Sequence, residues 1–341
     1  MTTHMQAEVQ EIPAATARFL GANASAAADA GAALRARDPG VLVTVARGSS
    51  DHAASYLKYA VELVAGVPVA SVGPSVASVY GRALKLDGAA CLGISQSGQS
   101  PDIVAMMESA GRAGALTLAL TNVAGAPLAR AAGHALALSA GEEKSVAATK
   151  TFVNSVVAGL LLLAEWQQDT ALREAVLALP GAFEEALSCD WAPLADRLVR
   201  AQSLYVLGRG PGFAIASEVA LKCKETSGLH AEAYSAAEVL HGPAAIVQDR
   251  FPVLALGVDD AALPGVIQTA ERLAAQGADV FLTARGAGGG VRALPHVAAL
   301  HPIVAPLVLV VSFYAFIEAL ARRRGFDPDK PPYLNKVTET L

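Results

Sequence analysis

Three hydroxyl groups, two amides and one glycine fall within six consecutive residues, Ser95-Gln96-Ser97-Gly98-Gln99-Ser100. The apolar run 90–94 precedes this loop, and a helical pattern that begins with Pro101-Asp102 follows it. Serine is a favourable helix N-cap, and proline is common at the first helical position. Because free backbone N–H groups at a helix N-terminus attract anions, the loop predicts a phosphate site without a formal positive charge. An ordinary serine-rich loop with a helix cap would have the same composition. The expected ligands are Ser95, Gln96, Ser97, Gly98 and Ser100.

A second polar loop, Arg47-Gly48-Ser49-Ser50-Asp51-His52, follows the apolar run 41–46. If the two runs are neighbouring strands of a parallel sheet, their carboxyl ends meet at one edge, and Gly48, Ser49 and Ser50 lie beside the serine-rich loop. Arg47 then either contacts a phosphate or sugar hydroxyl or forms a structural ion pair. His52 is either catalytic or a capping residue at a helix start. Residues 47–50 therefore join the candidate substrate-binding set.

A lysine and a glutamate stand three residues apart in the helical pattern that follows the strand-like run 203–208. Lys222 and Glu225 therefore project from one helix face, where an ammonium can keep a neighbouring carboxylate ionised. Such a carboxylate can act as a base. A solvent-exposed Lys–Glu pair would have the same spacing.

The chain contains an internal repeat with an offset of 162 residues. Arg47-Gly48 and Arg209-Gly210 both follow a strand-like run, and the same offset places 91–95 on 253–257. It also places His134 on His296. A shared offset over three strand-like segments predicts a duplication, which a single matching dipeptide would not.

Within each half, short apolar runs alternate with helical segments. The expected strands are near 41–46, 67–72, 90–95, 115–121 and 134–138 in the first half and near 203–208, 252–257, 278–283 and 296–301 in the second. This alternation predicts an α/β fold of two tandem doubly wound parallel-sheet domains, which bind ligands beyond the carboxyl ends of their strands. The expected boundaries are 1–35 for an N-terminal helical segment, 36–165 for the first domain, 166–195 for a helical linker, 196–326 for the second domain and 327–341 for a C-terminal tail.

The composition excludes several classes of protein. The chain has 341 residues, of which 53% are hydrophobic and 17% charged, so it can bury a large core and is not disordered. A formal net charge of −5 disfavours a general nucleic-acid binder, which is usually basic. The three cysteines form no Cys-x-x-Cys motif, which disfavours structural disulfides and a cysteine-based zinc site.

The most apolar stretch, residues 302–320, contains two prolines, a serine, a tyrosine and a glutamate. We interpret it as a buried or interface helix rather than a membrane span. Residues 1–13 include acidic residues and no apolar core, which argues against a signal peptide. We therefore expect a cytoplasmic protein that binds neither membranes nor nucleic acid.

Taken together and in order, these motifs resemble the sugar isomerase (SIS) family, whose domains have a flavodoxin-like fold. The resemblance is closer to the tandem SIS domains in the isomerase half of glucosamine-6-phosphate synthase. The family's phosphate motif is similar to 95–100, its second-domain signature to 207–243 and its C-terminal lysine motif to 331–341. The synthase also carries a glutaminase domain, whereas only about 40 residues precede the first expected strand here, so we expect no ammonia source from glutamine.

Four motifs look most like stand-alone SIS-type glucosamine-6-phosphate deaminases. They are RGSSDHA (47–53), PSVASVYG (74–81), SQSGQSPD (95–102) and GEEKSVAATK (141–150). The resemblance implies conversion of glucosamine 6-phosphate to fructose 6-phosphate and ammonia, an aldose–ketose isomerisation with no cofactor and no metal. Two alternatives stay open: a deglycase that acts on a fructosamine phosphate, and a non-catalytic sugar-phosphate-sensing protein.

The resemblance also implies catalytic roles. Glu225 matches the glutamate that carries a proton between C1 and C2 of the sugar, and Lys222 would stabilise the enediol oxygen. His241 matches a ring-opening histidine that reaches the neighbouring subunit's site, with Glu238 to orient it and His230 as a weaker candidate. We therefore expect a homodimer with shared sites, whose other partner is a phosphorylated hexosamine.

Lys336 matches a lysine that can form a Schiff base with a keto-sugar, and we expect it to contact substrate or to act as a lid in an active-site tail. Asn335 replaces the alanine that is usual in the family, and Ala148 replaces a serine near the sugar. Both positions are expected to affect the choice of hexosamine phosphate. Residues 142–144 are expected to form a solvated helix start, although Glu143 matches an acidic family position.

Overall fold

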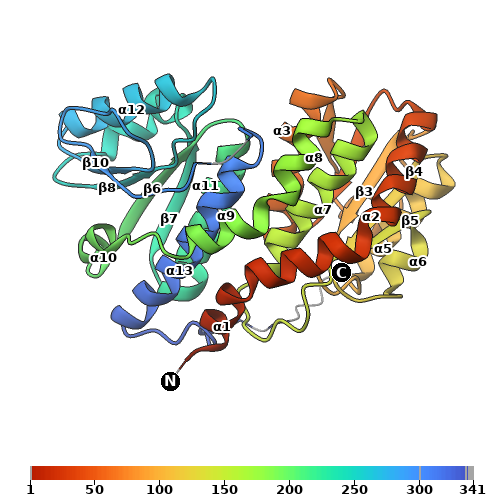
Figure 1. The fold of residues 1–341 in the computed structure, drawn as a ribbon, viewed down its shortest axis with the longest axis horizontal. Coiled ribbons are helices and arrows are strands. Elements are labelled where there is room, and N and C mark those ends of the chain that lie inside the picture. The colour runs from red at the N-terminus through yellow and green to blue at the C-terminus, as the bar shows by residue number, and fades with distance from the viewer. Residues whose placement is uncertain (1, 299–300, 335, 337–341) are drawn as a thin grey trace. The chain divides into compact units, whose positions relative to one another are not determined.

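The protein is described by a computed structural model that covers residues 2–298, 301–334 and 336. These residues form two compact units (Figure 1). The N-terminal unit comprises residues 12–143 and 150–178, and the C-terminal unit comprises residues 2–11, 144–149, 179–298, 301–334 and 336. The short segment 144–149 therefore belongs to the C-terminal unit although it lies in the first half of the sequence.

The N-terminal unit contains a five-stranded parallel sheet of order β2-β1-β3-β4-β5. Its strands are β1 (Leu42–Val45), β2 (Val69–Ser71), β3 (Ala90–Ile94), β4 (Leu116–Thr121) and β5 (His134–Ala137). Its helices are α2 (Ile12–Arg37), α3 (Ser49–Val64), α4 (Ser75–Ser78), α5 (Pro101–Arg112), α6 (Pro127–Ala131), α7 (Lys150–Gln167) and α8 (Thr170–Leu177). Helices cover both faces, which explains why the central strands are continuous apolar runs.

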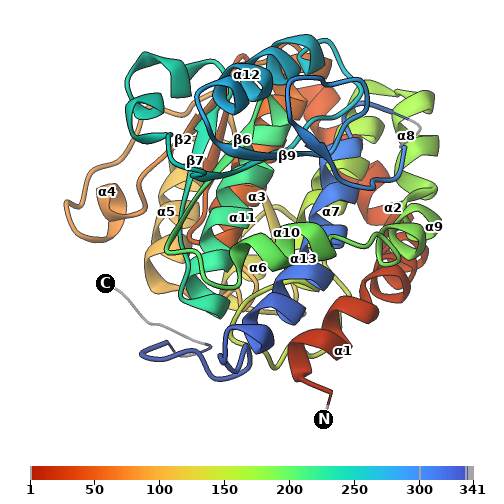
Figure 2. The ribbon, with the colours of Figure 1, turned by 90° about the vertical axis from the view of Figure 1, so that its left-hand side faces the viewer.

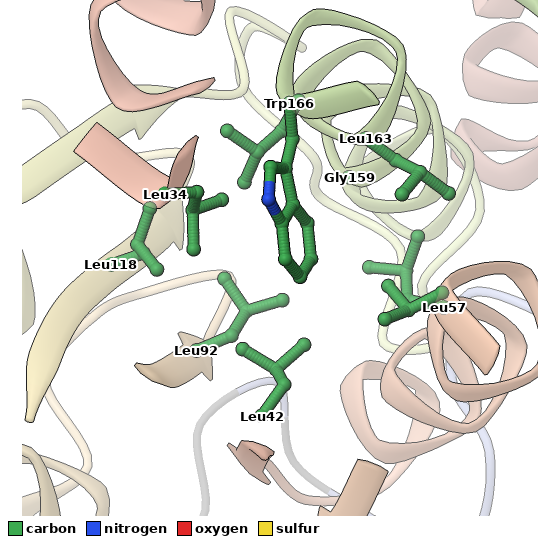
Figure 3. Close-up of a pocket in the computed structure, with 10 residues that line it drawn as sticks. Leu34, Leu42, Leu57, Leu92, Leu118, Gly159, Leu163 and Trp166 are labelled. Carbon is green, nitrogen blue, oxygen red and sulfur yellow. The ribbon is translucent and has the colours of Figure 1, made fainter. Parts of the chain in front are cut away.

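The two faces of this sheet bury alternate residues of each strand. Val43 and Cys91 pack with α5 and α6 on one face. Leu42 and Leu92, one position away, line a small apolar cavity on the other face, against α2, α3 and α7. Figure 3 shows the indole ring of Trp166 among the leucine side chains of this cavity. Because its lining is almost wholly apolar, the cavity belongs to the packed core and offers no partner for a charged phosphate.

The C-terminal unit contains a second five-stranded parallel sheet, of order β10-β9-β8-β6-β7. Its strands are β6 (Ser203–Gly208), β7 (His230–Ser235), β8 (Pro252–Ala255), β9 (Asp279–Leu282) and β10 (Arg292–Ala293). Its α-helices are α1 (His4–Gln10), α9 (Leu179–Ala186), α10 (Ala192–Leu198), α11 (Pro211–Ser227), α12 (Leu263–Ala275) and α13 (Ala305–Arg323). Two single turns of 3₁₀-helix, η1 (Glu238–His241) and η2 (Pro243–Ile246), follow β7.

The two sheets have the same topology, because β6 to β10 take the places that β1 to β5 occupy in the first sheet. The glycine that follows the first strand also has the same conformation in each half. Gly48 has φ 54° and ψ −133°, and Gly210 has φ 55° and ψ −134°, a region of backbone angles that favours glycine. The predicted fold, two tandem doubly wound parallel sheets, is confirmed.

Two strand assignments in the second half were wrong. The predicted strand at 296–301 is not a strand in the part that the structure describes, and the edge position belongs to the two exposed residues of β10. Strand β7 was missing from the prediction, since the sequence HAEAYS alternates polar and apolar residues instead of forming an apolar run. Edge strands need little burial, so a search for continuous apolar runs overlooks them.

Helix α13 is the one helix of the described residues that is long and apolar enough to cross a membrane by length and composition. Within the structure, 78% of its apolar window is buried. It packs against α1, α9, α10 and α11 (Figures 1 and 2). The expectation of a buried helix over 302–320 is therefore confirmed.

Candidate functional site

In the N-terminal unit, the two polar loops leave adjacent strands at the same edge of the sheet. Strands β1 and β3 pair in parallel, with Val45 opposite Gly93. The serine-rich loop that follows β3 is ordered by its own side chains. The Ser95 hydroxyl accepts a hydrogen bond from the Gly98 N–H at 3.1 Å, and the Ser97 hydroxyl accepts one from the Gln99 N–H at 3.3 Å.

Gly98 is required at its position. Its φ of +62° lies in the left-handed region, and a Cβ atom there would stand 2.6 Å from the Thr121 hydroxyl and from the Ala126 methyl group. Helix α5 begins at Pro101 as predicted, with Ser100 at the N-cap position, but the Ser100 side chain makes no capping hydrogen bond. The phosphate site at 95–100 and its ligands therefore stay a prediction, at a loop whose Gly98 and Gln99 N–H groups donate to serine hydroxyls.

Arg47 and Asp102 form an ion pair that joins the two loops. The Arg47 Nε lies 2.6 Å from Asp102 Oδ2, and its Nη2 contacts the same oxygen. The Asp102 side chain is 1% exposed, whereas that of Arg47 is 43% exposed. The structure thus shows the structural pairing that the sequence left open for Arg47, and contact of this side chain with a ligand stays a prediction. His52 lies in the first turns of α3, as expected of a helix start.

In the C-terminal unit, helix α11 carries the lysine and glutamate pair. The Lys222 Nζ lies 2.5 Å from Glu225 Oε2 and 3.2 Å from Glu218 Oε1. Lys222 and Glu218 are fully buried, and the side chain of Glu225 is 23% exposed. The pair is therefore not the solvent-exposed surface pair that the spacing also allowed, and Glu225 is the member that a small molecule can reach.

Opposing effects act on the ammonium group of Lys222. Burial alone lowers its pKa, but the negative charges and hydrogen bonds of Glu218 and Glu225 outweigh burial and leave the pKa above the ordinary value of 10.5. The ammonium therefore remains charged at neutral pH. A charged lysine held against a partly exposed carboxylate is suited to proton transfer beside a developing oxyanion.

His241 is exposed and ends the single turn η1 that follows β7. Glu238 begins the same turn and is also exposed, and the described residues show no hydrogen bond between the two. The predicted orienting role of Glu238 therefore has no support in the geometry. His230 begins β7 and is exposed as well.

Lys336 lies against the segment 144–149. Its Nζ donates a hydrogen bond to the backbone oxygen of Ser145 at 2.6 Å. The backbone N–H groups of Lys144 and Ser145 donate to the buried carboxylate of Glu8 in α1. Lys336 therefore contacts the segment that also contains the half-buried Ala148, within the C-terminal unit. Asn335 lies outside the described residues.

The expected solvated helix start at 142–144 is wrong. Helix α7 begins only at Lys150, and Glu143 is 5% exposed. Its carboxylate accepts hydrogen bonds from the Thr151 N–H at 3.2 Å and from the Thr151 hydroxyl at 2.5 Å. Glu143 therefore caps the first turn of α7 from within the N-terminal unit, as a carboxylate does near a helix N-terminus.

Sequence reasoning missed Glu218 and Tyr314. Glu218 stands four residues before Lys222, a spacing that could have indicated the contact. Tyr314 lies 96 residues from Glu218 in the sequence, and no local pattern connects them. Within residues 2–298, 301–334 and 336, no group of three or more histidine, cysteine, aspartate or glutamate side chains could hold a metal ion.

Comparison with known proteins identifies the repeated unit. The SIS domain model matches residues 37–165 and again 197–321. A glutamine–fructose-6-phosphate aminotransferase (isomerizing) of Halobacterium salinarum is 37% identical over 313 residues, which are 86% of this chain and 51% of that protein. The corresponding protein of Aeropyrum pernix is 36% identical over 327 residues, 87% of this chain and 51% of that protein. The chain spans about half the length of the curated relatives it matches.

Solved structures give a similar result. A proposed phosphosugar isomerase from Silicibacter pomeroyi DSS-3 superposes with a TM-score of 0.93 and 52% identity, over 96% of this chain and 100% of that chain. A glucosamine-6-phosphate deaminase from Thermotoga maritima superposes with a TM-score of 0.79 over 99% of this chain and 100% of that chain. Its identity is 20%, so this second likeness is one of fold alone.

Proposed function

The chain belongs to the SIS domain family, whose tandem members match it over both halves, and we propose that it is a sugar-phosphate isomerase that releases ammonia. The proposed reaction converts glucosamine 6-phosphate and water to fructose 6-phosphate and ammonia. The observation that carries this proposal is the buried Lys222 ammonium held against the partly exposed carboxylate of Glu225. A carboxylate reachable by a small molecule can move one proton between adjacent carbons without a cofactor.

The proposed steps assign each group a proton or a charge. His241 assists opening of the sugar ring, and the Glu225 carboxylate then takes the proton from C2. The fully buried Lys222 ammonium does not touch the sugar; it holds the Glu225 carboxylate in position and stabilises the charge that develops on the adjacent oxygen through space. Glu225 returns the proton to C1, which leaves an imine at C2, and water hydrolyses this imine to the ketone and ammonia. The serine-rich loop at 95–100 would bind the phosphate, which is carried on C6 of the sugar and takes no part in the bonds that change.

The test is an ammonia assay with a panel of hexosamine and fructosamine phosphates. We expect ammonia from glucosamine 6-phosphate, and exchange of its C2 proton with deuterated solvent. Glu225→Gln should abolish both signals while substrate still binds, because the amide keeps the shape and cannot take the proton. Glu185→Gln on the exposed surface of α9 is the matched control and should leave both unchanged.

Other results would select the alternatives. Ammonia released only from fructosamine phosphates would identify a deglycase. Binding of a sugar phosphate without turnover or proton exchange would identify a sensing protein. Normal proton exchange in Glu225→Gln would show that a different group carries the proton and would refute the assignment.

We also propose a homodimer in which His241 serves the neighbouring subunit's site. The exposure of His241 on a single turn of helix supports this proposal. Glu225→Gln and His241→Asn, each inactive alone, would be mixed under conditions that exchange subunits. A mixed dimer with shared sites contains one intact site, so about a quarter of wild-type activity should return at equal mixing. Proven subunit exchange without recovered activity would refute the shared site.

A further inference from the structure

We propose that Tyr314 is a positioning residue for proton transfer. Its buried hydroxyl fixes Glu218, so that the Lys222 ammonium stays shared between two carboxylates and holds Glu225 in place. This inference rests on the proposed function, because Glu225 is the group that would act on the sugar. Tyr314 itself is fully buried and cannot touch a substrate.

A chain of three contacts connects Tyr314 to Glu225. The Tyr314 hydroxyl donates to Glu218 Oε1 at 2.9 Å. The same carboxylate oxygen lies 3.2 Å from Lys222 Nζ, which lies 2.5 Å from Glu225 Oε2. Glu218, Lys222 and Glu225 occupy positions i, i+4 and i+7 of α11 and therefore share one helix face. Tyr314 comes from α13, which packs along α11 (Figure 1).

The carboxylates of Glu218 and Glu225 compete for hydrogen bonds from the Lys222 ammonium. Glu218 is fully buried, so water does not replace a hydrogen-bond donor that it loses. Without the Tyr314 hydroxyl, the Glu218 carboxylate would draw more strongly on Lys222, the cation that it already contacts. The ammonium would then move toward Glu218 and release Glu225. The tyrosine hydroxyl thus decides how the lysine divides its hydrogen bonds between two carboxylates.

The position of the chain of contacts predicts a specific kinetic signature. Among its four side chains only Glu225 is partly exposed. Loss of the hydroxyl therefore leaves the substrate-binding groups untouched and disturbs only the carboxylate that moves the proton. We expect kcat to fall while KM stays constant, whereas a general loosening of the fold would change both or neither.

The test compares two variants of α13 that each lose one buried hydroxyl. Tyr314→Phe keeps the ring and removes the donor to Glu218. Ser312→Ala removes a hydroxyl that donates to the Ala186 backbone oxygen at 2.9 Å, outside the chain of contacts. With the sugar phosphate that the wild type turns over, Tyr314→Phe should lower kcat and the C2 proton exchange rate about tenfold, with KM within about twofold. Ser312→Ala should leave kcat and KM within about twofold of wild type.

Equal kcat in Tyr314→Phe and wild type, or an equal loss in both variants, would overturn the proposal. If the wild type turns over no sugar phosphate, the proposed function fails, and a crystal structure of Tyr314→Phe then tests the positioning role by itself. We expect the Lys222 Nζ to Glu225 Oε2 distance to exceed 3.5 Å in that variant, beyond hydrogen-bonding range. An unchanged distance would overturn the inference whatever the substrate is.

Discussion

Replacement of Lys222 by methionine tests the buried charge cluster of α11 directly. Methionine keeps the unbranched apolar stem of lysine and removes the ammonium that contacts both Glu218 and Glu225. Glu218 would then be a fully buried carboxylate that has lost this cation. Glu225 is 23% exposed, so water would solvate part of its charge. Most of the lost free energy of unfolding therefore comes from the uncompensated charge of Glu218.

The expected loss of stability is large. Removing one partner of a buried ion pair costs about 3–5 kcal/mol, because the other charge is left without compensation. For a domain of this size about 1 kcal/mol lowers Tm by roughly 2–4 °C, so the unit should melt roughly 6–20 °C lower. Lys224→Met is the matched control on the same helix. Its side chain is exposed and donates a long hydrogen bond to the Ala231 backbone oxygen at 3.3 Å, so the loss should not exceed about 1 kcal/mol.

Calorimetry at pH 7 would measure both variants against the wild type. The double variant Glu218→Gln with Lys222→Met removes the uncompensated carboxylate as well, and it should recover most of the lost stability while activity stays absent. A Lys222→Met protein as stable as the wild type would refute the reasoning, since it would show that the ammonium does not compensate a buried charge.

The raised pKa of Lys222 also predicts how the stability of the protein depends on pH. The folded-state pKa of Lys222 lies above 10.5, its value in the unfolded chain, so the folded protein holds this proton more tightly. The stabilisation by the ammonium is therefore fully present below about pH 10.5 and is lost as the pH rises through the folded-state pKa. The difference in Tm between wild type and Lys222→Met should stay level from pH 7 to about 10 and shrink in stronger alkali.

Three further predictions follow from other parts of the chain. Ser97→Ala should raise KM roughly tenfold to a hundredfold with little change in kcat. The reason is that a hydrogen bond to a charged phosphate contributes about 1.5–3 kcal/mol. An unchanged KM would show that the phosphate binds elsewhere. Burial raises the pKa of Cys91 and Cys223 to about 12, so neither thiol should react with iodoacetamide at pH 8 in the native protein, as peptide mass spectrometry would show. Glu8→Gln replaces the carboxylate that accepts hydrogen bonds from the Lys144 and Ser145 N–H groups by a weaker, neutral acceptor. Amide hydrogen exchange of the segment 144–149 should therefore accelerate. Exchange at the wild-type rate would show that α1 does not restrain this segment.

Local patterns in the sequence predicted the parts of the fold that depend on neighbours in the chain. Strand and helix alternation follows from the periodicity of apolar residues, and two parallel sheets follow from the alternation. The loop at 95–100 and the start of α5 at Pro101 follow from turn and capping preferences of single residues. The face shared by Lys222 and Glu225 follows from the helical period alone.

Tertiary packing decided what those residues do. A Lys–Glu pair at this spacing is usually solvated, and it is buried here because α13 covers α11 and supplies Tyr314 from 96 residues away. Arg47 and Asp102 meet because β1 and β3 are adjacent in the sheet, although 55 residues separate them in the chain. Such contacts depend on which elements pack together, a choice made by the whole core and recorded in no local pattern. The carboxylates of Glu218 and Glu225 keep the buried Lys222 charged, and packing leaves Glu225 partly exposed. The chemistry available to the site therefore comes from the fold rather than from the motif.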